Sequence, residues 1–185
     1  MRVLRAGGLA TVQDLGWTGY RAIGLPPGGA ADRGALRIAN ALAGAGPDAA
    51  AVEVALGELE IEFEDDRTFA ATGAVGQLRL DGGAVPPGTG LRAHRGQRLR
   101  LAPDPAARFA YLAVGGGIAA PPTLGSRATY LPAALGGWQG RRLAAGDRIP
   151  LGPAGPPGGP DPGLTARFEG PIRVTTGPQI GRAHV

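Results

Sequence analysis

The sequence contains no cysteine and only two histidines, His94 and His184, which lie far apart in the chain. Without cysteine, the protein cannot form disulfides, zinc–thiolate sites or thiol nucleophiles. Two distant histidines do not indicate a metal site either. We therefore predict that this protein binds no metal.

Lysine is also absent, because all 19 basic residues are arginines. A GxxxxGK phosphate loop needs a lysine, and no GxGxxG occurs, so neither standard nucleotide loop is present. The arginines are scattered, and the sparse aromatic residues do not interleave with them. The net charge of +4 therefore does not indicate a nucleic-acid surface, and we expect no nucleic-acid partner.

No apolar run approaches the ~20 residues that span a bilayer. The first residues lack the apolar core of a signal peptide. We therefore expect a cytoplasmic protein with no membrane partner. A length of 185 residues suits one domain, or one domain and part of another.

Glycine and proline are abundant, with 34 and 18 residues, which favours many short strands and turns over a helical bundle. Residues 59–63 alternate apolar and acidic side chains, as a half-buried strand does, and residues 108–114 read as a strand buried on both faces. Asp65-Asp66 and Asp81-Gly82-Gly83 read as hairpin turns. Strands at such short intervals predict a mainly β sandwich or barrel.

One substantial helix is predicted. Asp32 is placed to cap it, because its side chain can accept from amides further along the first turn. Apolar residues follow at helical spacing up to Gly44, and Pro47 comes soon after, a typical helix stop. We expect the helix to start close to Asp32 and to end near Gly44. Residues 146–149 are expected to turn into a last strand.

The stretch before this helix, residues 11–32, is rich in glycine and carries Gln13, Asp14, Arg21 and Asp32. Two interpretations stay open from these residues alone. The stretch is either a glycine-rich loop that leads into a packing helix, or a loop that binds a ligand through those four side chains.

Several segments together resemble the family of the C subunit of 5-oxoprolinase, also described as allophanate hydrolase subunit 2 or the biotin-dependent carboxyltransferase A/B domain, which includes the Kip antagonist protein. The segments are residues 11–16, 19–21, 29–32, 37–40, 72–74, 111–114, 116–118 and 124–130. The similarity extends over residues 1–179. The family usually has other residues where Trp17, Ala31, Ala119 and Ala128 stand.

The resemblance implies a cyclophilin-like β-barrel with one substantial helix. It also implies a subunit of an ATP-dependent 5-oxoprolinase, which cleaves 5-oxoproline to glutamate together with a subunit-B-like protein and a third lactam-cleaving subunit. One alternative is the carboxyltransferase part of a urea-carboxylase-like or allophanate-hydrolase-like system, in which biotin carries the carboxyl group. A second alternative is a non-catalytic antagonist of a kinase-inhibitor protein. Without lysine, the chain itself cannot be the biotin carrier.

Asp14 and Asp32 are the candidate acid–base residues, because a general base needs a carboxylate or an imidazole. Asp14 could instead stabilise a turn, and Asp32 could only cap the helix. The candidate substrate-binding residues are Gln13, Arg21, Ser126, Arg127 and Tyr130. Of these, the arginines suit a carboxylate or phosphate. We expect the loops around residues 11–32 and 115–130 to meet at one mouth of the barrel.

The chain is expected to divide into four parts: a carboxyltransferase-type domain over residues 1–151, a Gly/Pro-rich linker-like segment over 152–170, the start of a truncated second half over 171–179, and residues 180–185. The last six residues are what codons that match a widely used sequencing adapter would encode, so we expect them to be read-through. The natural protein would then be longer, and this fragment would be inactive alone.

Overall fold

A computed structural model describes residues 1–156 and 158. It contains one α-helix, α1 (Arg33–Ala43), and two 3-10 helices, η1 (Arg21–Ile23) and η2 (Leu131–Ala133). The strands are β1 (Arg2–Ala6), β2 (Leu9–Gln13), β3 (Ala51–Leu56), β4 (Leu59–Glu62), β5 (Arg67–Gly73), β6 (Val75–Leu80), β7 (Gly83–Ala84), β8 (Leu91–Ala93), β9 (Arg98–Pro103), β10 (Ala110–Val114), β11 (Thr129–Tyr130) and β12 (Leu135–Gly136).

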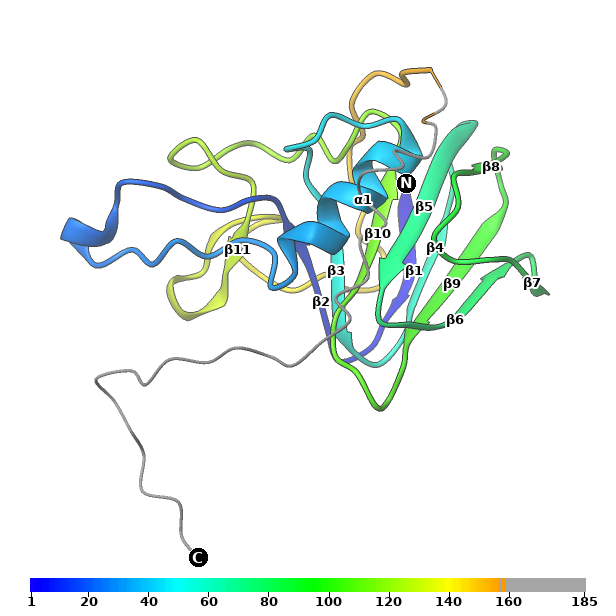
Figure 1. Cartoon of the computed structure of the whole chain (residues 1–185), viewed down its shortest axis with the longest axis horizontal. Coiled ribbons are helices and arrows are strands. Elements are labelled where there is room, and N and C mark those ends of the chain that lie inside the picture. Colours follow the sequence, from blue (N-terminus) through cyan, green and yellow to red (C-terminus); the bar gives the residue numbers. More distant parts are fainter. Residues whose placement is uncertain (157, 159–185) are drawn as a thin grey trace, which may run out of the picture.

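The strands form two five-stranded sheets and one small two-stranded sheet (Figure 1). The first sheet has the order β1-β4-β9-β6-β7, the second has the order β2-β3-β10-β5-β8, and β11 pairs with β12. All pairings are antiparallel. The chain is therefore mainly β with one substantial helix, as the sequence predicts. The described pairings give two sheets, and a closed barrel stays a prediction.

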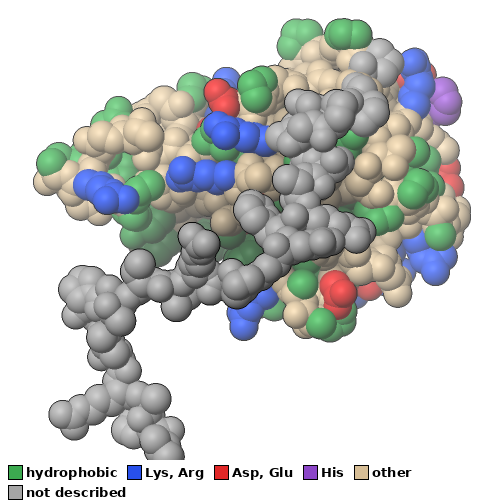
Figure 2. Space-filling view, viewed as in Figure 1, with side chains coloured by type: hydrophobic (Ala, Val, Ile, Leu, Met, Phe, Trp, Pro, Cys, Tyr) green, Lys and Arg blue, Asp and Glu red, His purple; other side chains and the backbone are tan. Residues whose placement is uncertain are grey.

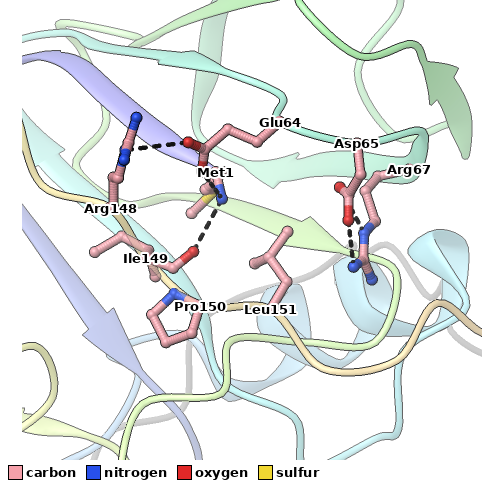
Figure 3. Close-up of a pocket in the computed structure, with 8 residues that line it drawn as sticks. All are labelled: Met1, Glu64, Asp65, Arg67, Arg148, Ile149, Pro150 and Leu151. Atoms are coloured by element: carbon pink, nitrogen blue, oxygen red, sulfur yellow. Dashed lines mark hydrogen bonds and ion pairs between the residues drawn. The ribbon is translucent and has the colours of Figure 1, made fainter.

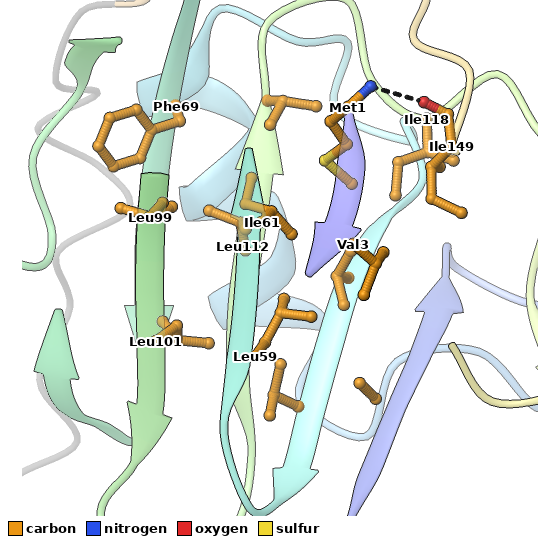
Figure 4. Packing of buried hydrophobic residues seen from close by; sticks show 14 of the residues in the cluster. Met1, Val3, Leu59, Ile61, Phe69, Leu99, Leu101, Leu112, Ile118 and Ile149 are labelled. Atoms are coloured by element: carbon orange, nitrogen blue, oxygen red, sulfur yellow. Dashed lines mark hydrogen bonds between the residues drawn. The ribbon is translucent and has the colours of Figure 1, made fainter. Parts of the chain in front are cut away.

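From β1 to β10, the chain passes from one large sheet to the other at nearly every step. The two exceptions are β2 to β3 and β6 to β7, where successive strands belong to the same sheet. The corners need glycine: Gly8 and Gly57 have φ of 64° and 76°. A Cβ on Gly8 would overlap the Leu56 carbonyl, so no other residue fits there without a shift. The side chains between the sheets form the main core, which includes Val3, Ile61 and Leu112 (Figure 4).

Strand β10 is the apolar centre of the second sheet. Its alternate residues Ala110, Leu112 and Val114 face the main core between the sheets. Tyr111 and Ala113 face the other way and pack against α1. All five residues of β10 are buried, which confirms the predicted strand with two buried faces.

Helix α1 covers the outer face of the second sheet through an alanine-rich stripe that includes Ala35, Leu36 and Ala39 (Figure 1). Its N-cap is Asp32, whose Oδ1 accepts from the Ala35 amide at 2.9 Å. Its C-cap is Gly44, in the left-handed conformation with φ of 71°. Both predicted ends of the helix are confirmed.

Two sequence predictions of strands are wrong. Asp65-Asp66 does not close a hairpin, because β4 belongs to the first sheet and β5 to the second. The turn carries the chain from one sheet to the other instead. Residues 146–149 do not begin a regular strand, since this part of the chain makes only isolated bridges such as Arg2 with Arg148. By contrast, the 81–83 turn does join a hairpin between β6 and β7.

The described part of the predicted linker, residues 152–156 and 158, contains no helix or strand. The remainder of the linker, the predicted second half and residues 180–185 lie outside the described residues. No helix within the described range is long and apolar enough to cross a membrane.

Candidate functional site

Two loops that are distant in the sequence meet at Asp14, directly after β2. Oδ1 of Asp14 accepts from the Ser126 hydroxyl at 2.6 Å and from the Gly16 amide at 2.7 Å. Its Oδ2 accepts from the Arg127 amide at 2.5 Å. Asp14 and Ser126 are both buried. The predicted meeting of the two loops is therefore confirmed, and we call this contact the Asp14 junction.

The local backbone explains why Ser126 reaches Asp14. Thr123 and Ser126 exchange backbone hydrogen bonds of 2.7 and 3.1 Å, which close a tight turn. The two central residues of this turn, Leu124 and Gly125, have φ of 50° and 83°. A leucine in the left-handed region is unusual and shows that the surrounding contacts fix the turn. The Ser126 hydroxyl also accepts from the Ala128 amide at 3.0 Å, so its orientation is determined.

Gln13 lies beside the junction and joins β2 to β11. Its amide nitrogen donates to Thr11 Oγ1 at 3.0 Å and to the Thr129 carbonyl at 3.2 Å. The Thr129 hydroxyl donates to the Val12 carbonyl at 2.9 Å. The buried Oε1 of Gln13 has no hydrogen-bond partner among the described residues. Tyr130 follows Thr129 and is half-buried at the start of η2.

The Asp32 side chain makes none of the junction's hydrogen bonds and lies at the exposed start of α1, two residues after Ala30, whose amide donates to the Asp14 carbonyl at 2.8 Å. Asp32 caps the helix with its side chain, as one of the two interpretations expects. Its amide donates to the Tyr111 hydroxyl at 2.7 Å. Tyr111 in turn donates to Oε2 of Glu53 at 2.7 Å, and the Ala31 amide donates to the same oxygen at 2.8 Å. Two residues that were not among the predicted site residues thus hold the loop that carries Asp32.

Glu53 and Tyr111 form a buried polar pair between β3 and β10. Burial raises the pKa of the Tyr111 phenol, and the neighbouring Glu53 carboxylate adds to that effect. The signal for this pair was present in the sequence, because Glu53 is the one charged residue in an otherwise apolar strand. A charge in such a strand is retained only when it is paired.

The two predicted arginines have different surroundings. The Arg127 side chain is half-buried, and its Nε donates to the Ala120 carbonyl at 2.8 Å. Arg21 is exposed on η1, at the end of a projecting arm formed by residues 16–29 (Figure 1, dark blue at the left). It lines a pocket together with Trp17 and Arg33, and neither Asp14 nor Asp32 is among the described residues that line it.

A second pocket, of about 350 Å³, contains none of the predicted site residues. It is lined by Met1, Glu64 and Arg148 among others (Figure 3). Glu64 lies within 3.3 Å of the Met1 amine and within 3.2 Å of Arg148 Nε. Arg67 pairs with Asp65 at 2.6 Å in the same pocket. Both carboxylates of this pocket are therefore paired with cations that also line it, and the pocket holds none of the predicted site residues. Among residues 1–156 and 158, no cluster of three or more His, Cys, Asp or Glu residues could hold a metal.

This two-sheet fold is that of a carboxyltransferase-type domain. The crystal structure of the Kluyveromyces lactis urea amidolyase is similar to 90% of this chain, with a TM-score of 0.78 and 31% identity, over 10% of the amidolyase chain. The chain belongs to the family described as carboxyltransferase domain, subdomain A and B, whose model matches residues 23–184.

Among curated relatives, the chain is similar to the C subunit of 5-oxoprolinase from Escherichia coli, with 47% identity over 152 residues. That alignment covers 82% of this chain and 49% of the relative, so the chain spans about half the length of that protein. Urea amidolyase of Lachancea kluyveri is 33% identical over 192 residues, which cover 95% of this chain and 10% of the amidolyase.

Proposed function

We propose that this chain is part of a subunit of an ATP-dependent 5-oxoprolinase, which cleaves 5-oxoproline to glutamate. The observation that carries the proposal is the 47% identity to the C subunit of the E. coli 5-oxoprolinase, against 33% to the urea amidolyase of L. kluyveri. The subunit would act with a subunit-B-like protein and a third lactam-cleaving subunit. We further propose a cytoplasmic location and a cyclophilin-like closure of the two sheets.

The chemistry explains why ATP is needed. A lactam carbonyl is a poor electrophile for water. Transfer of the γ-phosphoryl group of ATP to the carbonyl oxygen turns that oxygen into part of a phosphate leaving group. Water then adds to the carbon, and the C–N bond breaks with protonation of the nitrogen, so that the ring opens as an acyl phosphate. A second water hydrolyses this acyl phosphate and releases glutamate and phosphate. The protein's contribution is to hold the substrate carboxylate and to stabilise the anion that forms.

The described residues suggest how the roles divide. Asp14 is held by three donors, so it fixes the two loops relative to each other and sets the position of Ser126. Asp32 is exposed, and its Oδ2 accepts no hydrogen bond from a described residue. In this proposal Asp32 is therefore the general base that can reach a substrate or a water, while Gln13, Ser126, Arg127 and Tyr130 line the substrate side of the junction.

The alternative function is the carboxyltransferase part of a urea-carboxylase-like system, in which biotin delivers the carboxyl group. The observation that favours it is the similarity to urea amidolyases, which extends over 95% of this chain in L. kluyveri and 90% in K. lactis. A non-catalytic antagonist of a kinase-inhibitor protein is a further alternative, for which a neighbouring sporulation-kinase gene would be the indication.

A reconstituted assay tests the proposal. The protein that contains this chain is purified with its subunit-B-like and third partners, then supplied with ATP and 5-oxoproline, and glutamate release is measured. A parallel reaction contains urea, bicarbonate and a biotin carboxylase. We expect ATP-dependent glutamate release in the first reaction. If the second reaction consumes ATP in a urea-dependent way and neither reaction releases glutamate, the result supports the alternative function instead.

A further inference from the structure

A pocket of about 470 Å³ lies between the projecting arm and the start of α1. Its walls include Trp17, Thr18, Arg21, Pro27 and Arg33. Figure 2 shows arginine side chains along the lobe that projects to the left, on the face where the arm lies. The pocket thus brings together two arginines that are separated by a tight turn and the helix cap.

The guanidinium groups of Arg21 and Arg33 are not paired with a carboxylate in the described part of the chain. No acidic residue lines the pocket, and within the described part of the chain neither Arg21 nor Arg33 forms a salt bridge. Elsewhere, Arg67, Arg100 and Arg141 each lie 2.6 to 2.7 Å from a carboxylate. The pocket therefore concentrates positive charge that the described structure does not neutralise.

The position of Arg33 adds to this charge. Arg33 is the first residue of α1, and the first turn contains no acidic residue. The N-terminal end of a helix is its positive end, so a cation there is unfavourable unless an anion lies nearby. The N-cap carboxylate of Asp32 is such an anion, since its Oδ1 accepts from the Ala35 amide, but Asp32 does not line the pocket. The positive charge on the pocket walls therefore comes from Arg21 and Arg33.

Hydrogen bonds hold two walls of the pocket, Trp17 and Arg33, in place. The Trp17 indole donates from Nε1 to the Thr123 carbonyl at 2.8 Å, and the Trp17 amide donates to the Pro27 carbonyl at 2.6 Å. Arg33 donates from Nη2 to the Gly28 carbonyl at 3.3 Å, across the base of the arm. Trp17 and Arg33 are therefore positioned before a ligand binds, which reduces the conformational entropy lost on binding. The Arg21 side chain is exposed on η1 and would be ordered by the ligand.

We propose that this pocket binds the anionic oxygens of a small molecule, a carboxylate or a phosphate, through Arg21 and Arg33. A guanidinium offers two parallel donors that match either group. The inference deepens the proposed function, on which it rests: the carboxylate would belong to 5-oxoproline and the phosphate to ATP. It adds Arg33 to the predicted Arg21, and it separates their anion site from the Asp14 junction.

Calorimetric titration of the purified 185-residue chain tests the site. The probes are 5-oxoproline, ATP, inorganic phosphate and 2-pyrrolidinone, which is the same lactam without its carboxylate. Saturable binding of 5-oxoproline but not of 2-pyrrolidinone assigns the site to a carboxylate. Saturable binding of ATP and phosphate assigns it to a phosphate. Absence of saturable binding by all three anions at millimolar concentration overturns the proposal.

Arginine variants show whether the pocket is responsible. Arg21→Gln and Arg33→Gln should each weaken binding about tenfold or more, as expected for the loss of a charged donor. Arg37→Gln is the matched control, because Arg37 lies one turn further along α1 and outside the pocket lining. Circular dichroism confirms that each variant is folded. Equal weakening by Arg37→Gln would show non-specific attraction and overturn the site.

Failure of this inference is distinguishable from failure of the proposed function. If the titrations show no pocket-dependent binding while the reconstituted assembly releases glutamate, the anion site is wrong and the function stands. If anions bind through Arg21 and Arg33 but the assembly acts only on urea, the site stands and the 5-oxoprolinase function is wrong.

Discussion

Ser126 donates a 2.6 Å hydrogen bond to Asp14 across 112 positions of sequence. Three donors converge on this one carboxylate, from both loops, and the contact is buried. A buried carboxylate with three donors can be replaced by another side chain only if those donors find new acceptors. The junction therefore joins the two candidate loops, and its loss should disturb the conformation of both.

The Asp14 junction should be sensitive to an isosteric change. Asp14→Asn replaces one acceptor oxygen by a donor that faces either Ser126 or the Arg127 amide. We expect the free energy of unfolding to fall by about 1–3 kcal/mol, the typical effect of an unsatisfied buried group. Urea denaturation followed by circular dichroism measures it. Asp48→Asn is the control, since Asp48 is exposed and its ion pair with Arg37 is long, at 3.9 Å. An equal loss of stability in Asp48→Asn would contradict the role assigned to Asp14.

Two substitutions of Asp32 separate helix capping from catalysis. Asn is as good an N-cap as Asp, whereas Ala removes the cap and should lower stability by about 1 kcal/mol. If Asp32 is a general base, both Asp32→Asn and Asp32→Ala should abolish most ATP-dependent glutamate release in the reconstituted assembly. Full activity of Asp32→Asn would show that Asp32 is only a helix cap.

The buried pair of Glu53 and Tyr111 should show coupled energetics. Tyr111→Phe removes the hydroxyl that joins Oε2 of Glu53 to the Asp32 amide, and we expect a loss of about 1–3 kcal/mol in unfolding free energy. Glu53→Gln and the double variant complete a thermodynamic cycle. Tyr20→Phe is the control, because Tyr20 makes no side-chain hydrogen bond to a described residue. Additive effects of the two single variants would argue against the pair.

Stability should depend on pH through Asp147. Hydrogen bonds from the Arg141 guanidinium hold the pKa of the Asp147 carboxyl below its usual value. A lowered folded-state pKa stabilises the fold above the unfolded pKa of about 4, and this contribution is lost as the pH falls through the folded value. Wild-type stability should therefore drop more steeply than that of Asp147→Asn below about pH 4. Parallel pH profiles for the two proteins would disprove this link.

Several features could be predicted from the sequence because short-range chemistry determines them. The N-cap at Asp32, the stop at Gly44 and the doubly buried strand β10 all follow from neighbouring residues. The hairpin expected at Asp65-Asp66 is wrong because turn residues look alike whether the flanking strands pair or separate into two sheets. Only distant partners decide which of these occurs.

The candidate site also has some features that could be predicted from the sequence and others that could not. The meeting of the loops was predicted from the residues that they carry, and Asp14 with Ser126 confirms it. The pocket shared by Arg21 and Arg33 was not predicted, because it depends on how the arm folds back over the start of α1. Arg33 has no sequence motif of its own, and only the folded arm brings it into the same pocket as Arg21.

The alternation of successive strands between the two sheets determines how this domain must fold. Apart from β6 with β7 and the pair β2 and β3, consecutive strands up to β10 are not hydrogen-bonded neighbours. Neither sheet can therefore grow from one local hairpin, and loop closure precedes most of the stabilising contacts. We expect slow folding in a single cooperative transition. Neither sheet is one continuous segment of the chain, so neither can be excised as an autonomous unit.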